Sequence, residues 1–349
     1  MIKAISLFSG AGGMDVGFEG AGVKVVLANE IDKNAAETYR LNHPDTELLV
    51  DDIENIFVEL EKYQEIDLVF GGPPCQGFSV IGKMDPNDER SQLVWAFLKA
   101  VEVVRPKVFV MENVKALATI CKWKPIKEEI IKRANALGYG CIPFILNAVD
   151  FGVSQTRERV FFVGIQGQYS FGKEIEELLF LQKREALTIR ELFSDLGPAG
   201  SAKNPNTCNA KITFAVRPVM RRIPYDCLMF NGIGRPIDPD GYSRTITASM
   251  GGNMTLIVDE EYLHNKSSNN YIQEYYDKLV NNEIIPEFKE APARLRRLTI
   301  NESKRIQSFP DDYKFYGSKT SIYKQIGNAV PCGMAQAIAT AVLGYLGKG

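Results

Sequence analysis

The chain has 349 residues, of which 45% are hydrophobic and 24% charged, with a formal net charge of −2. These values are typical of an ordinary soluble globular protein with one large α/β domain or two domains. The chain begins without a basic region leading into a long apolar run, and no segment reaches about eighteen apolar residues. We therefore expect a cytoplasmic protein with neither a signal peptide nor a membrane span.

Cysteine and histidine usage argues against a zinc-binding protein and against a disulfide-stabilised one. The six cysteines are scattered without a C-x-x-C pair, and the chain has only two histidines. A zinc site therefore lacks suitably spaced ligands, and a disulfide framework is unexpected in a chain of this size without a secretion signal. We predict no metal site.

The first part of the chain alternates short apolar runs, rich in β-branched residues, with helical patterns such as 34–42 and 93–104. Near-continuous apolar strands between helices predict a parallel sheet covered on both faces. Ligands bind beyond the carboxyl ends of the strands in such sheets. The expected strands are residues 3–8, 24–30, 46–52, 66–72, 107–113, 141–148 and 159–165.

This alternation ends near residue 190, where a turn-rich segment begins and only short β-like pieces follow. Helical patterning returns at 294 and ends in a small-residue helix at 333–346. We therefore predict a second, smaller and irregular domain. The predicted division is 1–193, 194–321 and 322–349.

Charge is unevenly distributed. Residues 196–250 carry seven Lys or Arg against three Asp, residues 251–291 carry eight acids against three lysines, and basic residues return at 294–299. Such segregation suits a protein that turns one basic face to a polyanion. Unrelated solvated surfaces explain the same pattern, and charge alone does not decide between the two.

Polar residues at the first strand ends suggest a nucleoside ligand. The turn after the first strand matches G-x-G-x-x-G at Gly10 and Gly12, but Asp15 replaces the third glycine. This departure disfavours a dinucleotide phosphate site. Glu30 ends the second strand, where a carboxylate accepts ribose hydroxyls, and Asp52 ends the third, toward an adenine amino group. Taken singly, each of these features is better explained as a helix cap or a solvated acid, but three of them at consecutive strand ends favour an adenosine site.

Residues 77–84 imitate a phosphate loop, G-x-x-x-x-G-K. Met84 replaces the Ser or Thr that binds magnesium, and Pro86 lies in the acidic segment that follows, so no helix begins there to receive phosphates. We therefore disfavour a nucleoside triphosphatase.

A second group of polar residues lies at the ends of later strands. Cys75 follows two prolines after the fourth strand, and Glu112 and Asn113 end the fifth. Arg157 and Arg159 precede the seventh, and alternate residues of an extended segment point the same way. A lone cysteine is usually a small core residue. Here no histidine is available as a base, so the carboxyl group makes chemical sense as a group that acts on the substrate.

In this order, the motifs closely resemble those of the DNA (cytosine-5) methyltransferases, especially the compact bacterial modification enzymes. The resemblance covers about residues 1–167 and 294–349, with a variable region between them. The motifs are "LFSGAGGMDVGF", the Glu of "ANEID", "VDDI", "GGPPCQGFS", "MENV", "QTRERVFF", "RLTINESKRIQSFP" and "QIGNAVP".

The resemblance implies a Rossmann-like, S-adenosylmethionine-dependent methyltransferase sheet in a catalytic and cofactor-binding domain, 1–193. It implies a target-recognition domain and hinge at 194–321, and a C-terminal segment, 322–349, that returns to the catalytic domain. The cofactor-binding residues that it implies are Phe8, Gly10, Gly12, Glu30, Asp52, Ile53, Pro74, Asn328 and Val330.

The implied reaction is methylation of cytosine carbon 5. The Cys75 thiolate adds to carbon 6 and so activates carbon 5, while Glu112 stabilises the developing charge at ring nitrogen 3. Arg157 and Arg159 hold the base carbonyl and the acidic cluster, and Asn113 shapes the pocket. The base that removes the carbon 5 proton is not identified.

The implied substrate is double-stranded DNA, from which the target cytosine is flipped out. The segment from Cys75 to Arg90 is expected to close over DNA as a mobile loop. The implied DNA-contacting residues are Gln76, Ser79, Arg90, Arg244, Thr245 and Ile246.

Other classes remain as alternatives. Transfer-RNA cytosine-5 methyltransferases share the catalytic motifs, although their C-F-T tripeptide is absent here and the variable region is long. A catalytically inactive DNA-binding relative would not need intact catalytic residues, and a nicotinamide oxidoreductase fits the glycine pattern poorly. We expect a monomer in the bacterial cytoplasm and nucleoid, with a cognate restriction endonuclease as a possible partner.

Overall fold

The computed structural model describes residues 1–64, 66–74 and 92–347, which form two compact units. The first unit comprises Met1–Gly152, Arg157–Glu185 and Ala329–Gly349, and the second comprises Val153–Thr156 and Ala186–Asn328. The division expected from the sequence, with boundaries at 193 and 321, remains a prediction about the functional regions of the chain.

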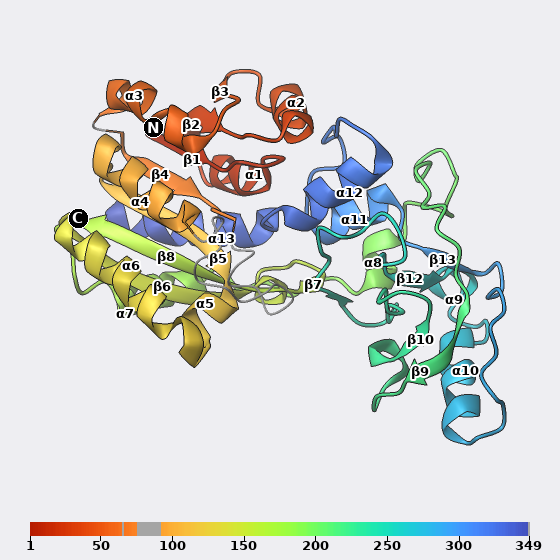
Figure 1. Cartoon of the computed structure of the whole chain (residues 1–349). Helices are drawn as coiled ribbons and strands as arrows, with labels where there is room; N and C mark the ends of the chain where they lie inside the picture. Colours follow the sequence, from red (N-terminus) through yellow and green to blue (C-terminus); the bar gives the residue numbers. More distant parts are fainter. Residues whose placement is uncertain (65, 75–91, 348–349) are drawn as a thin grey trace. The chain divides into compact units, whose positions relative to one another are not determined.

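A seven-stranded sheet lies at the centre of the first unit, with the strand order β3-β2-β1-β4-β5-β8-β6 (Figure 1). The α/β class expected from the sequence is confirmed, and all seven expected strands are present. The third is shorter than expected and ends at Leu49. The strands are β1 (Ile2–Leu7), β2 (Val23–Asn29), β3 (Glu47–Leu49), β4 (Leu68–Gly71), β5 (Val108–Val114), β6 (Tyr139–Asn147) and β8 (Glu158–Gln166).

The expectation of an all-parallel sheet is wrong, because β8 runs antiparallel to both β5 and β6. Only residues 148–157 separate β6 from β8. A parallel pair needs a crossover of about a dozen residues or more, usually with a helix. The short connection therefore forces β8 to reverse direction, and the sheet is mixed.

Helices cover the sheet of the first unit. The expected helix at 93–104 is present with these bounds as α4 (Leu93–Val104), and its buried face includes Val94, Phe97 and Val101 at helical spacing. The other helices are α1 (Gly13–Gly20), α2 (Lys33–Asn42), α3 (Phe57–Leu60), α5 (Lys115–Thr119), α6 (Lys124–Ala136), α7 (Gly172–Phe180) and α13 (Cys332–Leu346), with 3₁₀ turns η1 (Ile53–Asn55), η2 (Glu61–Tyr63), η4 (Cys121–Trp123) and η5 (Ala148–Asp150).

Residues 319–346 are long and apolar enough to cross a membrane, by length and composition only. They form two helices, because α12 (Lys319–Asn328) ends before Pro331, which lies at the N-cap of α13. α13 packs against α1 so closely that a Cβ on Gly17 would lie 2.5 Å from the Cβ of Ala335. Burial against α1 and the rest of the first unit accounts for the apolar character of α13.

The second unit is irregular, as expected, and is built on three two-stranded ladders. β7 (Gln155–Thr156) pairs with β11 (Ser243–Arg244), β9 (Phe214–Val219) with β10 (Leu228–Phe230), and β12 (Ile257–Asp259) with β13 (Leu295–Arg297). Its helices are α8 (Ile189–Phe193), α9 (Glu260–His264), α10 (Tyr271–Val280), α11 (Ile300–Ile306) and α12, with the 3₁₀ turn η6 (Pro224–Asp226).

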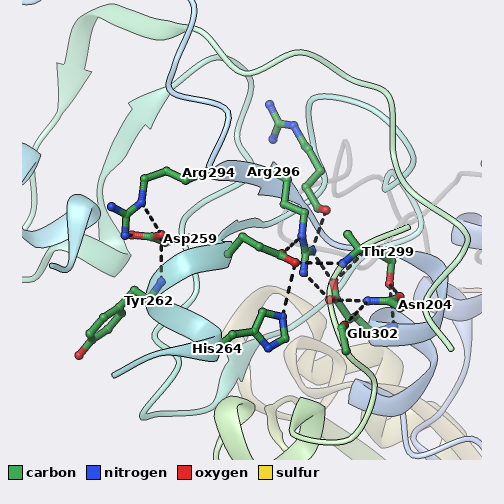
Figure 2. A network of polar contacts seen from close by, with 12 residues as sticks. Asn204, Asp259, Tyr262, His264, Arg294, Arg296, Thr299 and Glu302 are labelled. Carbon is green, nitrogen blue, oxygen red and sulfur yellow. Dashed lines mark hydrogen bonds and ion pairs between the residues drawn. The ribbon is translucent and has the colours of Figure 1, made fainter. Parts of the chain in front are cut away.

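The basic run at 294–299 does not form an exposed cationic face, which corrects one element of the expected charge distribution. Arg294 pairs with Asp259 at 2.8 Å, and Arg296 pairs with Glu302 at 2.7 Å (Figure 2). Arg297 is 1% exposed and donates to backbone carbonyls. These guanidinium groups connect separate segments of the second unit, and they give the buried carboxylates and carbonyl oxygens around them hydrogen-bond partners.

Candidate active site

Two consecutive glycines bring the end of β4 close to its neighbouring strands. A Cβ on Gly71 would lie 2.1 Å from the carbonyl oxygen of Leu7, and one on Gly72 would lie 3.1 Å from Glu112 Oε2. Only glycine permits such close approach at these positions. The segment that leads to Cys75 therefore starts in contact with the Glu112 carboxyl group.

The Glu112 carboxyl group is buried beside two arginines. Its Oε1 lies 3.0 Å from Arg159 Nε, where β5 and β8 lie side by side. Burial raises the pKa of Glu112, while the positive charges of Arg159 and Arg157 act in the opposite direction and do not fully offset burial. Glu112 therefore keeps its proton to higher pH than an exposed glutamate does.

Asn113 ties the segment before Cys75 to β5. It is 1% exposed, and its Nδ2 donates to the carbonyl oxygen of Pro73 at 3.4 Å. Its Oδ1 accepts from the backbone N–H of Val114 at 3.0 Å. Asn113 is thus a positioning residue, while the next residue along the segment, Pro74, is exposed.

The predicted nucleophile Cys75 and the predicted DNA contacts Gln76, Ser79 and Arg90 lie outside the described residues. The structure thus brings Glu112, Asn113, Arg157 and Arg159 together with residues 72 and 73, immediately before Cys75.

The buried cysteines among the described residues are poor nucleophiles. Burial raises the pKa of Cys141 to about 12 and also raises the pKa values of Cys227 and Cys332. The thiolate is the reactive form of cysteine, so these three thiols are unreactive at neutral pH.

Gly72→Ala tests the contact between the glycine pair and Glu112. The added methyl group meets Glu112 Oε2 at 3.1 Å, and displacement of a catalytic group is expected to slow methylation by about tenfold or more. Single-turnover methylation rates measure the effect. Gly172→Ala is the matched control, because its methyl group meets the side chain of Ile142, first the flexible Cδ1 at 3.3 Å and then Cγ2 at 3.7 Å. Equal rates in the two variants would contradict the assignment.

The turn between β1 and α1 has an unusual backbone. Phe8, Gly10 and Gly12 have φ values of 54°, 57° and 81°. Positive φ at a non-glycine residue such as Phe8 costs energy and clusters at functional sites. Nothing lies within 4 Å of a Cβ built on Gly10. The turn therefore leaves open space beside its backbone, as a bound ligand requires.

Glu30 joins this turn to the end of β2. Its Oε2 accepts from the backbone N–H of Gly10 and its Oε1 from that of Asp32, both at 2.7 Å. Burial raises the pKa of Glu30, and these hydrogen bonds act in the opposite direction. The carboxyl group is held in a fixed orientation at the strand ends, where a ribose is expected.

Asn29 is a positioning residue that the sequence analysis did not identify. It is 2% exposed, its Nδ2 donates to the carbonyl oxygens of Leu49 and Asp51, and its own carbonyl accepts from Ser9 N–H. It therefore ties the ends of β1, β2 and β3 together. The sequence contained a signal for this role, because Asn29 is a polar residue at the end of an apolar strand, next to Glu30.

The remaining predicted cofactor residues are less tightly connected. Asp52 follows β3 by three residues and caps η1, because its Oδ1 accepts from Glu54 N–H at 3.0 Å. Ile53 is buried below it. Val330 is buried in the first unit, whereas Asn328 is the exposed last residue of α12 and belongs to the second.

Asp15, which the sequence analysis noted only as a departure from a glycine pattern, is a buried carboxyl group under this turn. It is fully buried in α1, and its Oδ1 accepts from the hydroxyl of Tyr39 at 2.9 Å. Burial raises the pKa of Asp15 to about 6. The folded state therefore keeps the proton on Asp15 to higher pH than the unfolded chain does.

Asp15→Asn is expected to stabilise the protein at neutral pH. With a pKa raised from 3.8 to about 6, Asp15 reduces stability as pH rises through this interval, by about 3 kcal/mol in total. The asparagine variant cannot ionise and should lack this loss. Urea unfolding from about pH 4 to about pH 8 measures it, with the exposed Asp45→Asn as control. Parallel stability curves for Asp15→Asn and wild type would contradict the assignment.

The predicted DNA contacts in the second unit differ in accessibility. Arg244 is exposed but pairs with Asp226. Thr245 donates from Oγ1 to the carbonyl oxygen of Thr156 at 2.8 Å. Ile246 is 1% exposed, so its side chain belongs to the core of the second unit and offers no exposed surface for DNA.

Comparison with known proteins identifies the family. The family model described as C-5 cytosine-specific DNA methylase matches residues 2–344. The type II methyltransferase M.NgoPII of Neisseria gonorrhoeae is 31% identical over 352 residues, covering 98% of this chain and 95% of that protein. M.FnuDI of Fusobacterium nucleatum, also a type II methyltransferase, is 34% identical over 342 residues, covering 97% and 93%.

Solved structures share the fold. The S. pombe Dnmt2 methyltransferase superposes with a TM-score of 0.69 at 18% identity, covering 99% of each chain. The Entamoeba histolytica methyltransferase EhMeth gives 0.68 at 16% identity, with the same coverage.

The mixed α/β fold is shared with solved methyltransferase structures. The chain belongs to the C-5 cytosine-specific DNA methylase family. It is a DNA cytosine methyltransferase with S-adenosylmethionine as its cofactor.

Proposed function

We propose that this methyltransferase acts on a cytosine flipped out of duplex DNA, through a covalent bond between Cys75 and carbon 6. The observation that carries the proposal is the buried Glu112 carboxyl group, which lies beside Arg159 and against Gly72, three residues before Cys75. In this proposal the Cys75 thiol works beside this proton donor, because only residues 73 and 74 separate it from Gly72.

The reaction begins when the Cys75 sulfur forms a bond to carbon 6 with its electron pair. The electrons of the double bond between carbons 5 and 6 form a double bond between carbons 4 and 5, and those of the bond between carbon 4 and nitrogen 3 move to nitrogen 3, which takes the proton of Glu112. Carbon 5 is then an enamine carbon that can take the methyl group that S-adenosylmethionine would supply, with S-adenosylhomocysteine as the leaving group. A base then removes the carbon 5 proton, the double bond re-forms, and the Cys75 thiolate leaves as Glu112 recovers its proton.

The raised pKa of Glu112 suits this role, because a neutral carboxyl group can donate a proton whereas a carboxylate cannot. Arg159 orients the carboxyl group through the 3.0 Å contact between its Nε and Glu112 Oε1. Arg157, buried nearby, holds the base carbonyl in the proposed complex. Asn113 fixes the backbone of Pro73 and so limits the positions that Cys75 can adopt.

The turn after β1 and the ends of β2 and β3 suit the cofactor. Glu30, fixed by two backbone N–H groups, accepts the ribose hydroxyls. Gly10 and Gly12 allow the methionine part to approach the backbone, Phe8 stacks on the adenine, and Asp52 meets its amino group. Pro74, Ile53, Val330 and Asn328 complete the proposed site.

The proposed substrate is a specific sequence in double-stranded DNA. Carbon 5 and carbon 6 of a cytosine are out of reach inside a duplex, so the target base is flipped out. The region 194–321 is the proposed target-recognition domain, and residues 76–90 the proposed loop over DNA. We further propose a monomer that works in the bacterial cytoplasm and nucleoid, with a cognate restriction endonuclease.

Transfer of a labelled methyl group tests the proposal directly. Purified protein is given labelled S-adenosylmethionine with duplex DNA or with total RNA, and bisulfite sequencing then locates the methylated cytosines. We expect label in DNA at one recurrent sequence. Labelling of RNA alone would overturn the DNA substrate and favour the transfer-RNA alternative.

A further inference from the structure

The arginines of the second unit divide into two groups. Seven of the ten have guanidinium groups engaged by carboxylates or carbonyl oxygens. The other three have no hydrogen bond or ion pair from the guanidinium group to any described residue. The engaged ones are Arg190, Arg235, Arg244, Arg294, Arg296, Arg297 and Arg305, and the others are Arg217, Arg221 and Arg222.

The three unengaged arginines lie together on one β-hairpin, residues 214–230, formed by β9, the connection through η6, and β10. All three are exposed. Exposed aliphatic side chains flank them along the chain: Val216 is 56% exposed and Ile223 50% exposed. Surface arginines elsewhere in this unit are paired, so this combination of free cations and exposed aliphatics distinguishes the hairpin.

The base of the hairpin is anchored in the protein core. Phe214 and Phe230 face each other across β9 and β10 and are both buried, and the Phe214 ring lies 4.6 Å from that of Tyr275 in α10. Figure 1 shows β9 and β10 beside α10. Only Phe214 is buried among the residues of β9, so Val216–Val219 extends away from this core.

The backbone of the connection is fixed, although the guanidinium groups of Arg221 and Arg222 have no hydrogen bond or ion pair to a described residue. The hydroxyl of Tyr276 donates to the carbonyl oxygens of Arg221 and Arg222, at 3.0 and 3.1 Å. The backbone N–H of Arg221 donates to Cys227 Sγ at 3.1 Å. A rigid backbone that presents unpaired arginines loses little conformational freedom on binding, which favours specific contacts.

We propose that this hairpin enters the major groove of the DNA substrate and that its arginines determine the target sequence; this rests on the proposed function. A two-stranded ribbon fits the major groove, where an arginine binds guanine with two hydrogen bonds. Aliphatic side chains contact thymine methyl groups there. Phosphate contacts alone would need the cations but not Val216 and Ile223.

The test compares the target sequence of wild type with those of Arg217→Ala, Arg221→Ala and Arg222→Ala. Each protein is expressed in a host without cytosine methylation, and bisulfite sequencing of the host DNA gives the methylated sites. In at least one variant, methylation outside the wild-type target should rise by about five- to hundredfold relative to methylation within it, the value of one lost base contact. Unchanged targets and fidelity in all three variants, and in the triple variant, would overturn the proposal.

Lys278→Ala is the control, because it removes one exposed cation from α10 in the same unit and should keep the wild-type target. For inactive variants, competition between target and unrelated duplexes gives the same comparison from binding alone. An equal loss of affinity for both duplexes, with a weaker salt dependence, would show contacts to phosphate only and overturn the inference.

Failure of the proposed function gives a different result. A wild-type protein that methylates RNA alone contradicts the proposed function. In that case, full affinity of the triple variant for duplex DNA would also contradict the proposal that the hairpin binds DNA. A fall in that affinity would show that the hairpin binds DNA even though the proposed function is wrong. Thermal unfolding should be nearly the same in all variants, because the three guanidinium groups form no hydrogen bond or ion pair with a described residue.

Discussion

Cys75→Ala should abolish DNA methylation, reducing the rate by at least about four orders of magnitude, because no other group can form the bond to carbon 6. Affinity for S-adenosylmethionine should be nearly unchanged, since the thiol does not take part in cofactor binding. Labelled methyl transfer measures the first quantity and calorimetric titration with S-adenosylhomocysteine the second.

Cys121→Ala is the matched control, because Cys121 is a free, exposed cysteine in the first unit. It should methylate DNA at the wild-type rate. If Cys75→Ala lost cofactor affinity and folding stability together with activity, Cys75 would be a core residue and not a nucleophile. If it kept activity, the covalent route would be wrong.

Glu112→Gln should slow methylation by about 10²- to 10⁴-fold, because an amide can donate a hydrogen bond to nitrogen 3 but cannot transfer a proton. The wild-type single-turnover rate should fall as pH rises through the raised pKa of Glu112, since the neutral acid is the active form. The glutamine variant should lack this high-pH decline.

Glu158→Gln is the control variant for Glu112→Gln. Glu158 is exposed at the start of β8, next to Arg159, and pairs with Lys115 at 2.6 Å. Its replacement should leave both the rate and the pH profile close to those of wild type. A Glu112→Gln variant that kept the high-pH decline would assign the titration to another group.

The strands could be predicted because each is a largely apolar run. Polar residues and glycines at the ends of several of them suggested the candidate site, and the roles of its residues stay predictions. The direction of β8 was missed, although the short connection from β6 to β8 already excluded a helical crossover. Hydrophobic runs indicate where strands lie, and only the connection lengths indicate their direction.

Residue-level roles in the second unit were harder to predict, because sequence shows charge but not its partners. The arginines at 294–297 looked like a DNA-binding run, yet they are paired inside the unit. Ile246 matched a recognition motif but is buried. The free arginines at 217–222 had no motif to single them out, and only the absence of partners among the described residues distinguishes them.

Close approaches between strands were equally invisible in the sequence. The contact between Gly72 and Glu112 depends on the register of β4 and β5, which pairs Gly71 with Met111. Asn29 and Asp15 form tertiary hydrogen bonds to residues far along the chain. Such contacts follow from the fold as a whole, not from local pattern.

The most direct test of the covalent mechanism uses duplex DNA with 5-fluorocytosine at the target position. Because fluorine cannot leave carbon 5 as a proton does, the reaction should stop with protein, base and methyl group joined. Mass spectrometry of the digested complex should find the methylated base attached to Cys75, and Cys75→Ala should form no complex. An enzyme that methylates ordinary DNA but forms no adduct on this substrate, or forms it at another residue, would contradict the account.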